Sequence, residues 1–177
     1  MFFWHLGATV AFIRYAFRDE RMDLRFLMAG AVLANFIDTP IGFAFWDELQ
    51  NVRLFTHTLL VVSAIMVFVL VTTRRGRPRK RWMPLAIGML MQLFLDAMWQ
   101  EPDTLWWPFL GWEFSSTGFA TVGEYVGSVL KDWRMWALEV LGFAYLVYLA
   151  KRSGLGDPDK RKVFLTKGIV SAPIDRR

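Results

Sequence analysis

Five long stretches of mostly apolar residues follow one another along the chain, with short polar segments between the first four and a longer segment before the fifth. They cover residues 2–17, 24–46, 54–73, 82–99 and 135–150. A helix needs roughly 20 apolar residues to cross the hydrocarbon core of a bilayer. The stretch at 54–73 carries no charged side chain, apart from His57 when it is protonated. The pattern predicts an all-α fold, a polytopic membrane bundle of about five transmembrane helices.

The Lys and Arg residues predict how this bundle is oriented. The segment RRGRPRKR at residues 74–81, residues 18–25 and the tail after residue 150 together hold 17 of the 21 Lys and Arg residues. Loops of this composition lie on the cytoplasmic side of membrane proteins. We therefore expect the N-terminus outside and the C-terminus in the cytoplasm. Eight of the nine Trp residues then fall on the external side, at the level where indole rings favour the headgroup zone.

This topology divides the chain into two regions. Residues 1–150 form the transmembrane bundle, and residues 151–177 form a basic cytoplasmic tail that we expect to be poorly ordered. An external loop at about 100–133 precedes the last span. Its segment WWPFLGWEF is too apolar to stand free in water, so we expect it to lie on the membrane interface or to fold back as a lid.

Composition agrees with a membrane protein and narrows its partners. The chain is 55% hydrophobic, 16% aromatic and 21% charged, and it has no cysteine. Disulfides and thiolate metal sites are therefore excluded. The net charge of +5 sits in short blocks between apolar stretches. We interpret the basic segment at 74–81 as a topology determinant that touches anionic lipid, so the expected partners are membrane lipids and not nucleic acid.

Four polar residues within the predicted spans need an explanation, because a charged group there costs about 2.5–3.5 kcal/mol. His5, Asp38, His57 and Asp96 come from four different helices, all near the external side, and the two histidines are the only ones in the chain. Two neutral imidazoles and two carboxylates supply four N/O ligands with a charge of −2. That set matches one divalent ion such as zinc or manganese.

Other polar residues lie one helical turn from this set. Arg53 precedes His57 and is placed to hold an anionic phosphate. Helical spacing also brings in three uncharged neighbours: Thr9, Asn35 and Gln92. The sequence Asp38-Thr39-Pro40 predicts a break in the second helix, because proline removes a backbone donor.

Simpler interpretations stay open beside the metal site. A histidine near a helix end is often interfacial, and an isolated Asp in a span is often paired with a neighbouring helix. Glu139 has no obvious partner, so we interpret it as packing against polar groups of the bundle. Glu101, Asp103 and Glu113 are expected to face water, with Glu101 as an alternative ligand or base.

Four motifs occur in order within residues 1–110. They are an N-terminal His5, the segment ANFIDTP with Asp38 and Pro40, the segment VRLFTH with Arg53, Thr56 and His57, and the segment QLFLDAMW with Asp96, after which WWPF places Pro108 twelve residues on. In order and spacing they resemble the membrane-bound metal-dependent hydrolases, described as LexA-binding, inner-membrane-associated hydrolases. That family carries T-H, then L-P-D-I-D-x-P, then H-R-G-x-T-H, then H-x-x-x-D-x-x-T.

The chain departs from the family pattern at four positions. Phe36 stands where the family has an Asp, Val52 and Gln92 where it has His, and Trp99 where it has Thr. Half of the ligand set that the resemblance implies is therefore missing. This chain is expected to hold at most a reduced, mononuclear site, or to have lost catalysis.

These observations lead to one main functional hypothesis. It is a metal-dependent hydrolase in the cytoplasmic (inner) membrane of a prokaryote, acting at the outer face on a lipid or lipid-linked phosphoester. His5, Asp38, His57 and Asp96 would bind zinc or manganese, Asp38 or Asp96 would act as base if it is not a ligand, and Arg53 would hold the substrate anion. A non-catalytic scaffold of the same fold with a degenerate metal site is the alternative. A proton or ion path is disfavoured, since the polar residues stop near one face.

Overall fold

The computed structural model describes residues 1–18 and 22–170, and within them the fold is all-α. Nine α-helices and two short 3-10 turns follow one another. Their bounds are α1 Phe3–Phe17, α2 Leu24–Ala44, α3 Trp46–Leu49, η1 Phe55–His57, α4 Leu59–Thr72, α5 Arg77–Leu95, η2 Met98–Gln100, α6 Pro102–Leu105, α7 Val122–Lys131, α8 Trp133–Arg152 and α9 Pro158–Lys167.

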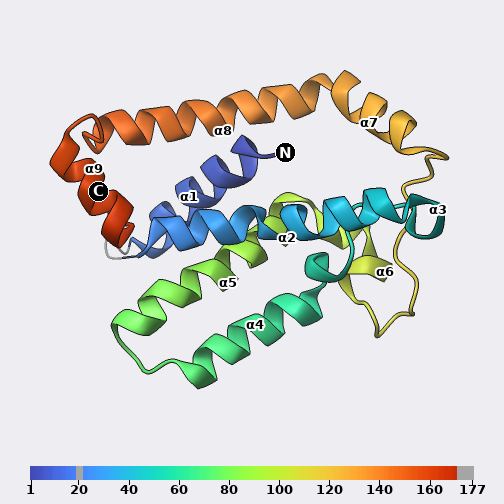
Figure 1. Cartoon of the computed structure of the whole chain (residues 1–177), viewed down its shortest axis with the longest axis horizontal. Coiled ribbons are helices and arrows are strands. Elements are labelled where there is room, and N and C mark those ends of the chain that lie inside the picture. Colours follow the sequence, from blue (N-terminus) through green and yellow to red (C-terminus); the bar gives the residue numbers. More distant parts are fainter. Residues whose placement is uncertain (19–21, 171–177) are drawn as a thin grey trace.

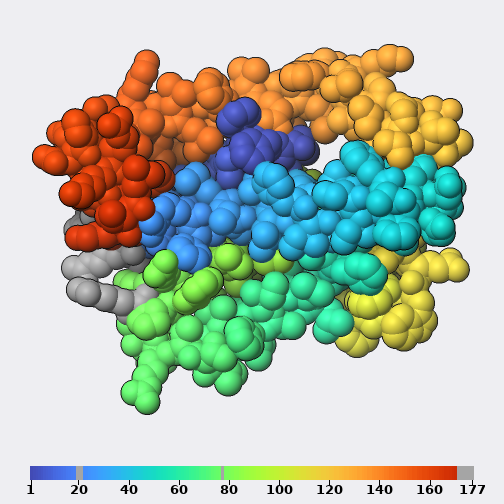
Figure 2. All heavy atoms as spheres, viewed as in Figure 1, coloured from blue at the N-terminus to red at the C-terminus, as the bar shows by residue number. Residues whose placement is uncertain are grey.

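The five long helices α1, α2, α4, α5 and α8 form one bundle (Figure 1). Helix α2 packs against α5 and α1, while α1 also packs against α8 and α5 against α4. In the space-filling view α2 crosses the middle of the molecule, between α8 on one side and α4 with α5 on the other (Figure 2). Helix α2 is therefore the central helix of the bundle.

Two pairs of glycines let neighbouring helices come unusually close. A Cβ atom on Gly88 of α5 would lie 2.2 Å from the carbonyl oxygen of Leu27 on α2, and one on Gly30 would lie 2.0 Å from the carbonyl of Leu85. At the α1–α8 crossing, a Cβ on Gly7 would lie 2.3 Å from the carbonyl of Gly142. Close approach through small residues is the usual way that helices associate within membranes.

The all-α prediction is confirmed, but five membrane spans are not established by the helices themselves. Of the described helices, α2 is the one that is both long and apolar enough to cross a membrane. Helices α1 and α4 have 15 and 14 residues, and α8 ends in the basic pair Lys151 and Arg152. Length and composition therefore support one span, and the remaining four stay a prediction.

The predicted break at Pro40 is wrong, because α2 continues through it to Ala44. Proline removes only one backbone donor, and here the helix ends four residues later. Tertiary contact holds this last turn in place: a Cβ on Gly42 would lie 2.2 Å from the carbonyl oxygen of Asn51.

Two other boundaries differ from the prediction. His57 lies in the separate turn η1, and α4 begins only at Leu59, where Thr58 caps it by accepting a hydrogen bond from the N–H of Val61 at 3.2 Å. Helix α5 begins at Arg77, so most of the basic segment at 74–81 forms its first turn and not a loop. The connection between α4 and α5 is correspondingly short.

The tail is more ordered than expected. Helix α9 follows α8 closely, and the N–H of Leu24 donates to the carbonyl of Gly168 at 2.9 Å. Val170 is buried in the same core cluster as Leu24 and Leu27. Basic composition suggested a loose tail, but these contacts dock it onto the start of α2 as far as residue 170.

Candidate functional site

Three of the predicted site residues meet inside the bundle. His5 lies in the first turn of α1, His57 in η1, and Asp96 caps the C-terminal end of α5. His5 Nε2 is 3.2 Å from Asp96 Oδ1, and His57 Nε2 is 3.6 Å from Asp96 Oδ2. Both imidazoles are fully buried and the Asp96 side chain is 5% exposed. The three side chains therefore converge, which a similar predicted depth alone did not establish.

The other nitrogen of each imidazole is already used. His5 Nδ1 is hydrogen-bonded to the carbonyl oxygen of Met1, and His57 Nδ1 is 2.7 Å from Asp38 Oδ2. A carbonyl and a carboxylate oxygen only accept, so each Nδ1 must be the donor. A neutral ring then leaves the lone pair of Nε2 directed at the Asp96 carboxylate. Within the described residues, His5 Nε2 and Asp96 Oδ2 have no hydrogen-bond partner.

Imidazole lone pairs and a buried carboxylate repel each other. Arg53 Nη2, at 3.7 Å from Asp96 Oδ1, offsets part of this repulsion, and a positive charge between the groups would offset the rest. Protons on both Nε2 atoms would supply it at the cost of two buried imidazolium groups, whereas one metal ion would satisfy all three side chains. Two ligands of a tetrahedral zinc ion lie about 3.3 Å apart, and the distances of 3.2 and 3.6 Å fall on either side of that value. The donor types and the two orphaned atoms fit one divalent ion.

A complete ligand shell is not preformed. The described part of the chain contains no ready group of three or more His, Asp or Glu side chains arranged to hold a metal. His5 lies against Oδ1 of Asp96, whereas His57 lies against Oδ2. An ion would therefore have to draw the two imidazoles toward one common point.

Asp38 lies beside this centre and fixes the turn that carries His57. Its carboxylate accepts from the backbone N–H of Leu54 at 2.8 Å, of Thr56 at 3.0 Å and of His57 at 3.2 Å, besides the His57 ring. All four bonds reach Oδ2 and the side chain is fully buried. One carboxylate on α2 thus holds both the backbone of η1 and the orientation of the imidazole.

Arg53 points into the site from the segment before η1. Its Nη2 is 3.7 Å from Asp96 Oδ1, and its Nη1 donates to Glu101 Oε1. Burial lowers the pKa of Arg53, but Asp96 and Glu101 more than offset it, so that the pKa is raised and the group stays charged. Glu101 in turn accepts from Asn51 Nδ2 at 3.3 Å. Glu101 was expected to face water. Its contact with Arg53 could not be predicted, because the segment around Glu101 has no helical periodicity from which to infer a neighbour.

The uncharged neighbours Gln92 and Asn35 lie beside the site, whereas Thr9 does not orient His5. Gln92 is fully buried, and its carboxamide nitrogen is 3.4 Å from His57 Nε2. Turned over, the same amide donates to the carbonyl of Ala31 at 3.2 Å and accepts from the N–H of Asn35 at 3.3 Å. The Thr9 hydroxyl is buried without a hydrogen-bond partner in the described chain, and Met1 orients His5 in its place.

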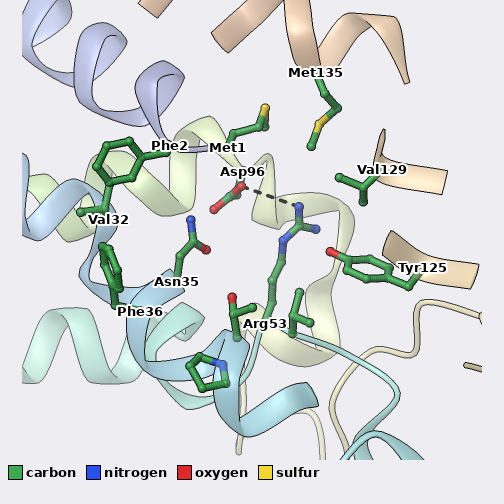
Figure 3. Close-up of a pocket in the computed structure, with 13 residues that line it drawn as sticks. Met1, Phe2, Val32, Asn35, Phe36, Arg53, Asp96, Tyr125, Val129 and Met135 are labelled. Carbon is green, nitrogen blue, oxygen red and sulfur yellow. Dashed lines mark ion pairs between the residues drawn. The ribbon is translucent and has the colours of Figure 1, made fainter. Parts of the chain in front are cut away.

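A pocket of about 420 Å³ opens beside Asp96 and Arg53 (Figure 3). Phe2 and Phe36 form one wall, while Val129 and Met135 form the opposite one, with Arg53 between them. The pocket is therefore apolar at its sides and charged at its floor.

One more residue that lines the pocket comes from the short helix α7. Tyr125 of α7 lines the pocket, with its hydroxyl directed toward the Arg53 guanidinium (Figure 3). Burial raises the pKa of Tyr125, although Arg53 acts in the opposite direction. Its ring also packs on Trp46 at a centroid distance of 5.4 Å. Tyr125 was not predicted as a site residue, because the segment at about 100–133 was expected to be a loop and its helix α7 was not foreseen.

Two of the departures from the family pattern also line this pocket. Phe36 and Val52 occupy its wall at the positions where the resembled hydrolases carry Asp and His. Apolar side chains thus replace donors on the side of the site that faces the pocket. The groups that remain able to bind a metal ion are the two histidines, Asp96 and the oxygen atoms of the residues next to Asp96.

Glu139 has a partner after all. This residue of α8 accepts from the backbone N–H of Phe3 at 2.7 Å and from that of Phe2, and it lies 3.9 Å from the amino group of Met1. The first N–H groups of a helix lack partners within the helix. Glu139 satisfies two of them and so fixes the end of α1 that carries His5.

The sequence pattern of one protein family covers nearly the whole chain. The family described as YdjM inner membrane protein matches residues 3–155. The matched range includes all five predicted site residues, which are His5, Asp38, Arg53, His57 and Asp96. Comparisons with curated proteins and with solved structures found no match. The inner-membrane part of the resemblance noted in the motifs is confirmed, whereas hydrolase activity and metal dependence stay predictions.

Proposed function

Because the chain belongs to the YdjM inner membrane protein family, we propose that it is a membrane-embedded, metal-dependent hydrolase of a lipid or lipid-linked phosphoester. One observation carries the proposal: the lone pairs of two buried imidazoles face the carboxylate of Asp96, beside a pocket that Arg53 also lines. The site would act at the outer face of the cytoplasmic membrane.

The bundle as a whole would be embedded, with α1, α2, α4, α5 and α8 as five spans. Large apolar side chains are exposed on the outer faces of these helices, among them Phe12, Phe68, Val71, Phe94 and Val140. Such a surface is unusual for a soluble protein and is suited to lipid. The basic ends of α5 and α8 lie at the same end of the bundle as α9 (Figure 1), which supports a common cytoplasmic side.

The ligands in this proposal are His5 Nε2, His57 Nε2 and Asp96. When bound, a divalent ion supplies Lewis-acid chemistry, which activates water and polarises the ester that is cleaved. Asp38 would act as a positioning residue, since its hydrogen-bonded oxygen already serves His57 and three backbone groups. A carboxylate that holds the far nitrogen of a ligand histidine fixes its tautomer and direction.

The pocket indicates the class of substrate. Arg53 supplies a guanidinium that binds a phosphate through two parallel hydrogen bonds, and Glu101 holds it in place from the other side. The walls formed by Phe2, Phe36 and Met135 suit an apolar chain next to that phosphate. The combination favours an amphiphilic phosphoester over a soluble one.

Elemental analysis of detergent-purified protein tests the proposal. We expect about one equivalent of zinc or manganese in the unaltered protein. The variants His57→Ala and Asp96→Asn should lose it, while Asp103→Asn, which changes an exposed external carboxylate, should keep it. Proteins that retain metal are then assayed on phosphatidate and on short-chain lipid phosphates. No metal in the unaltered protein, even after reconstitution with each ion, would overturn the hydrolase mechanism.

A non-catalytic scaffold is the second candidate. It is favoured by Phe36 and Val52, which place apolar side chains at the wall of the pocket. In this case the His–Asp cluster serves as structural glue, and Asp96 is neutralised by protonated histidines. The scaffold predicts that chelators leave thermal stability unchanged, whereas a resident metal makes stability depend on the chelator.

A further inference from the structure

A second pocket lies at the opposite end of the bundle from the histidines. It measures about 850 Å³ and is located where α2 and α5 begin and where α9 ends (Figure 1). The charged residues that line it are Asp23, Arg25, Lys80, Arg81 and Lys167. None of the proposed hydrolase residues contributes to it.

The described lining of this pocket has a large excess of positive charge. Four basic side chains face one carboxylate, and that carboxylate is already used. Arg25 binds Asp23 through two parallel contacts, Nε to Oδ1 at 3.0 Å and Nη2 to Oδ2 at 2.7 Å. The charges of Arg81 and Lys167 are therefore not balanced by Asp23.

The start of α5 makes this excess more costly. The N-terminus of a helix carries a partial positive charge and favours acidic residues in its first turn. The first turn of α5 has no acidic residue, and its N-cap Gly76 provides no side-chain cap. Arg79 turns away to donate to the carbonyl of Leu70 on α4 at 2.8 Å. An anion in the pocket would offset both the helix dipole and the clustered cations.

The surroundings of the pocket favour a lipid over a free anion. Lys80 and Arg79 also border a groove of about 180 Å³ along α5, and its other lining residues are the apolar Met22, Met83, Pro84 and Ile87. Beside it, Trp82 packs edge-on against Phe26 at 4.9 Å, and the Arg81 guanidinium lies 5.0 Å from the same Phe26 ring. Tryptophan next to a basic residue is typical of the membrane interface.

We propose that this pocket binds the phosphate of an anionic phospholipid, with one acyl chain in the groove along α5. The proposal uses the membrane embedding of the chain and is independent of the hydrolase chemistry. In the orientation proposed above, the pocket faces the cytoplasmic leaflet, which carries the anionic lipids.

Native mass spectrometry of the full chain, released from detergent with added lipid, measures this binding. The probes are phosphatidylglycerol, phosphatidylcholine with the same acyl chains, and glycerol phosphate as the free anion. The double variant Arg81→Gln/Lys167→Gln removes two pocket charges. The double variant Arg74→Gln/Lys162→Gln removes two exposed charges outside the pocket and serves as the matched control.

We expect phosphatidylglycerol to bind more tightly than phosphatidylcholine and glycerol phosphate. Each Lys or Arg near an anionic headgroup contributes about 1 kcal/mol, so the pocket variant should bind phosphatidylglycerol about 30-fold more weakly. The control should bind as the unaltered protein does. Equal binding of the two lipids, equal loss in both variants, or glycerol phosphate binding as tightly as the lipid would each overturn the proposal. If the pocket variant fails to fold, the comparison of the three probes on the unaltered chain decides it.

Discussion

Replacing Asp38 by Asn distinguishes a residue that positions His57 from one that binds the ion itself. The substitution keeps the size of the side chain and one acceptor oxygen but removes the charge. In the structure this carboxylate receives four hydrogen bonds, from the N–H groups of Leu54, Thr56 and His57 and from His57 Nδ1. With its oxygen at the position of Oδ2, asparagine can keep all four bonds, but they become bonds to an uncharged acceptor. Its amide nitrogen then takes the place of Oδ1, which lies 3.3 Å from the backbone nitrogen of Thr56.

The size of the effect follows from these contacts. Hydrogen bonds to a charged group contribute about 1.5–3 kcal/mol each. Bonds to an uncharged acceptor contribute about 0.5–1.5 kcal/mol each, so weakening all four should lower the free energy of unfolding by about 3 kcal/mol. This change is detectable against typical stabilities of about 5–15 kcal/mol. A residue that orients a ligand histidine usually changes metal affinity about 10- to 100-fold. We therefore expect zinc binding by Asp38→Asn to be weakened within that range and not abolished.

The assay is a competition titration of zinc against a chromophoric chelator, with thermal unfolding in the same detergent as the check on folding. Asp96→Asn is measured in parallel, because Asp96 contacts both Nε2 atoms and its loss should abolish binding. If Asp38→Asn abolishes zinc binding as completely as Asp96→Asn while remaining folded, Asp38 is a ligand and the positioning role is refuted. If zinc binding is unchanged, His57 is not oriented by Asp38 in the way the geometry indicates.

Two further changes test other parts of the structure. Arg53→Lys keeps the charge but loses the planar guanidinium, and with it one charged hydrogen bond to the phosphate. It should therefore raise the KM for a short-chain phosphatidate about tenfold and leave the metal content unchanged. An unchanged KM would show that Arg53 does not bind the substrate. Gly88→Ala places a Cβ 2.2 Å from the Leu27 carbonyl and should destabilise the bundle by about 1–3 kcal/mol, measured by thermal unfolding. Gly127→Ala on α7 is its control, because a Cβ added there would meet no atom of another part of the structure within 4 Å. An equal loss of stability in both variants would contradict tight α2–α5 packing.

The sequence predicted a similar depth for His5, His57 and Asp96, but it did not predict that they meet. Once the basic loops fix the orientation, residue position along each apolar stretch gives membrane depth, and equal depth on neighbouring helices permits contact. The same reasoning placed Arg53 at the external side, where it contacts Asp96. The sequence did not show which helices are neighbours. In the structure, the close contacts at Gly30 and Gly88 bring α2 and α5 together.

Three features were not predictable for a common reason: each depends on a contact between distant segments. The turn η1 replaces the first helical turn because Asp38, on another helix, binds its N–H groups. Glu101 turns toward Arg53 from a segment without helical period. Helix α9 docks because Gly168, at a φ of 70°, lets the backbone lie against Asp23, where a Cβ would be 1.7 Å from Oδ1.

The hydrogen bonds of Asp38 also explain how a site with few remaining donors can keep its geometry. In a site held together only by metal, loss of ligands such as those replaced by Phe36 and Val52 would release the histidines. Here the backbone of η1 is fixed by a carboxylate on α2, and the start of α1 is fixed by Glu139 on α8. Both histidines are thus positioned by protein contacts that need no ion. The framework can therefore outlast changes in the ligand set, and metal binding at the proposed site would then depend on Asp96 and the two Nε2 atoms.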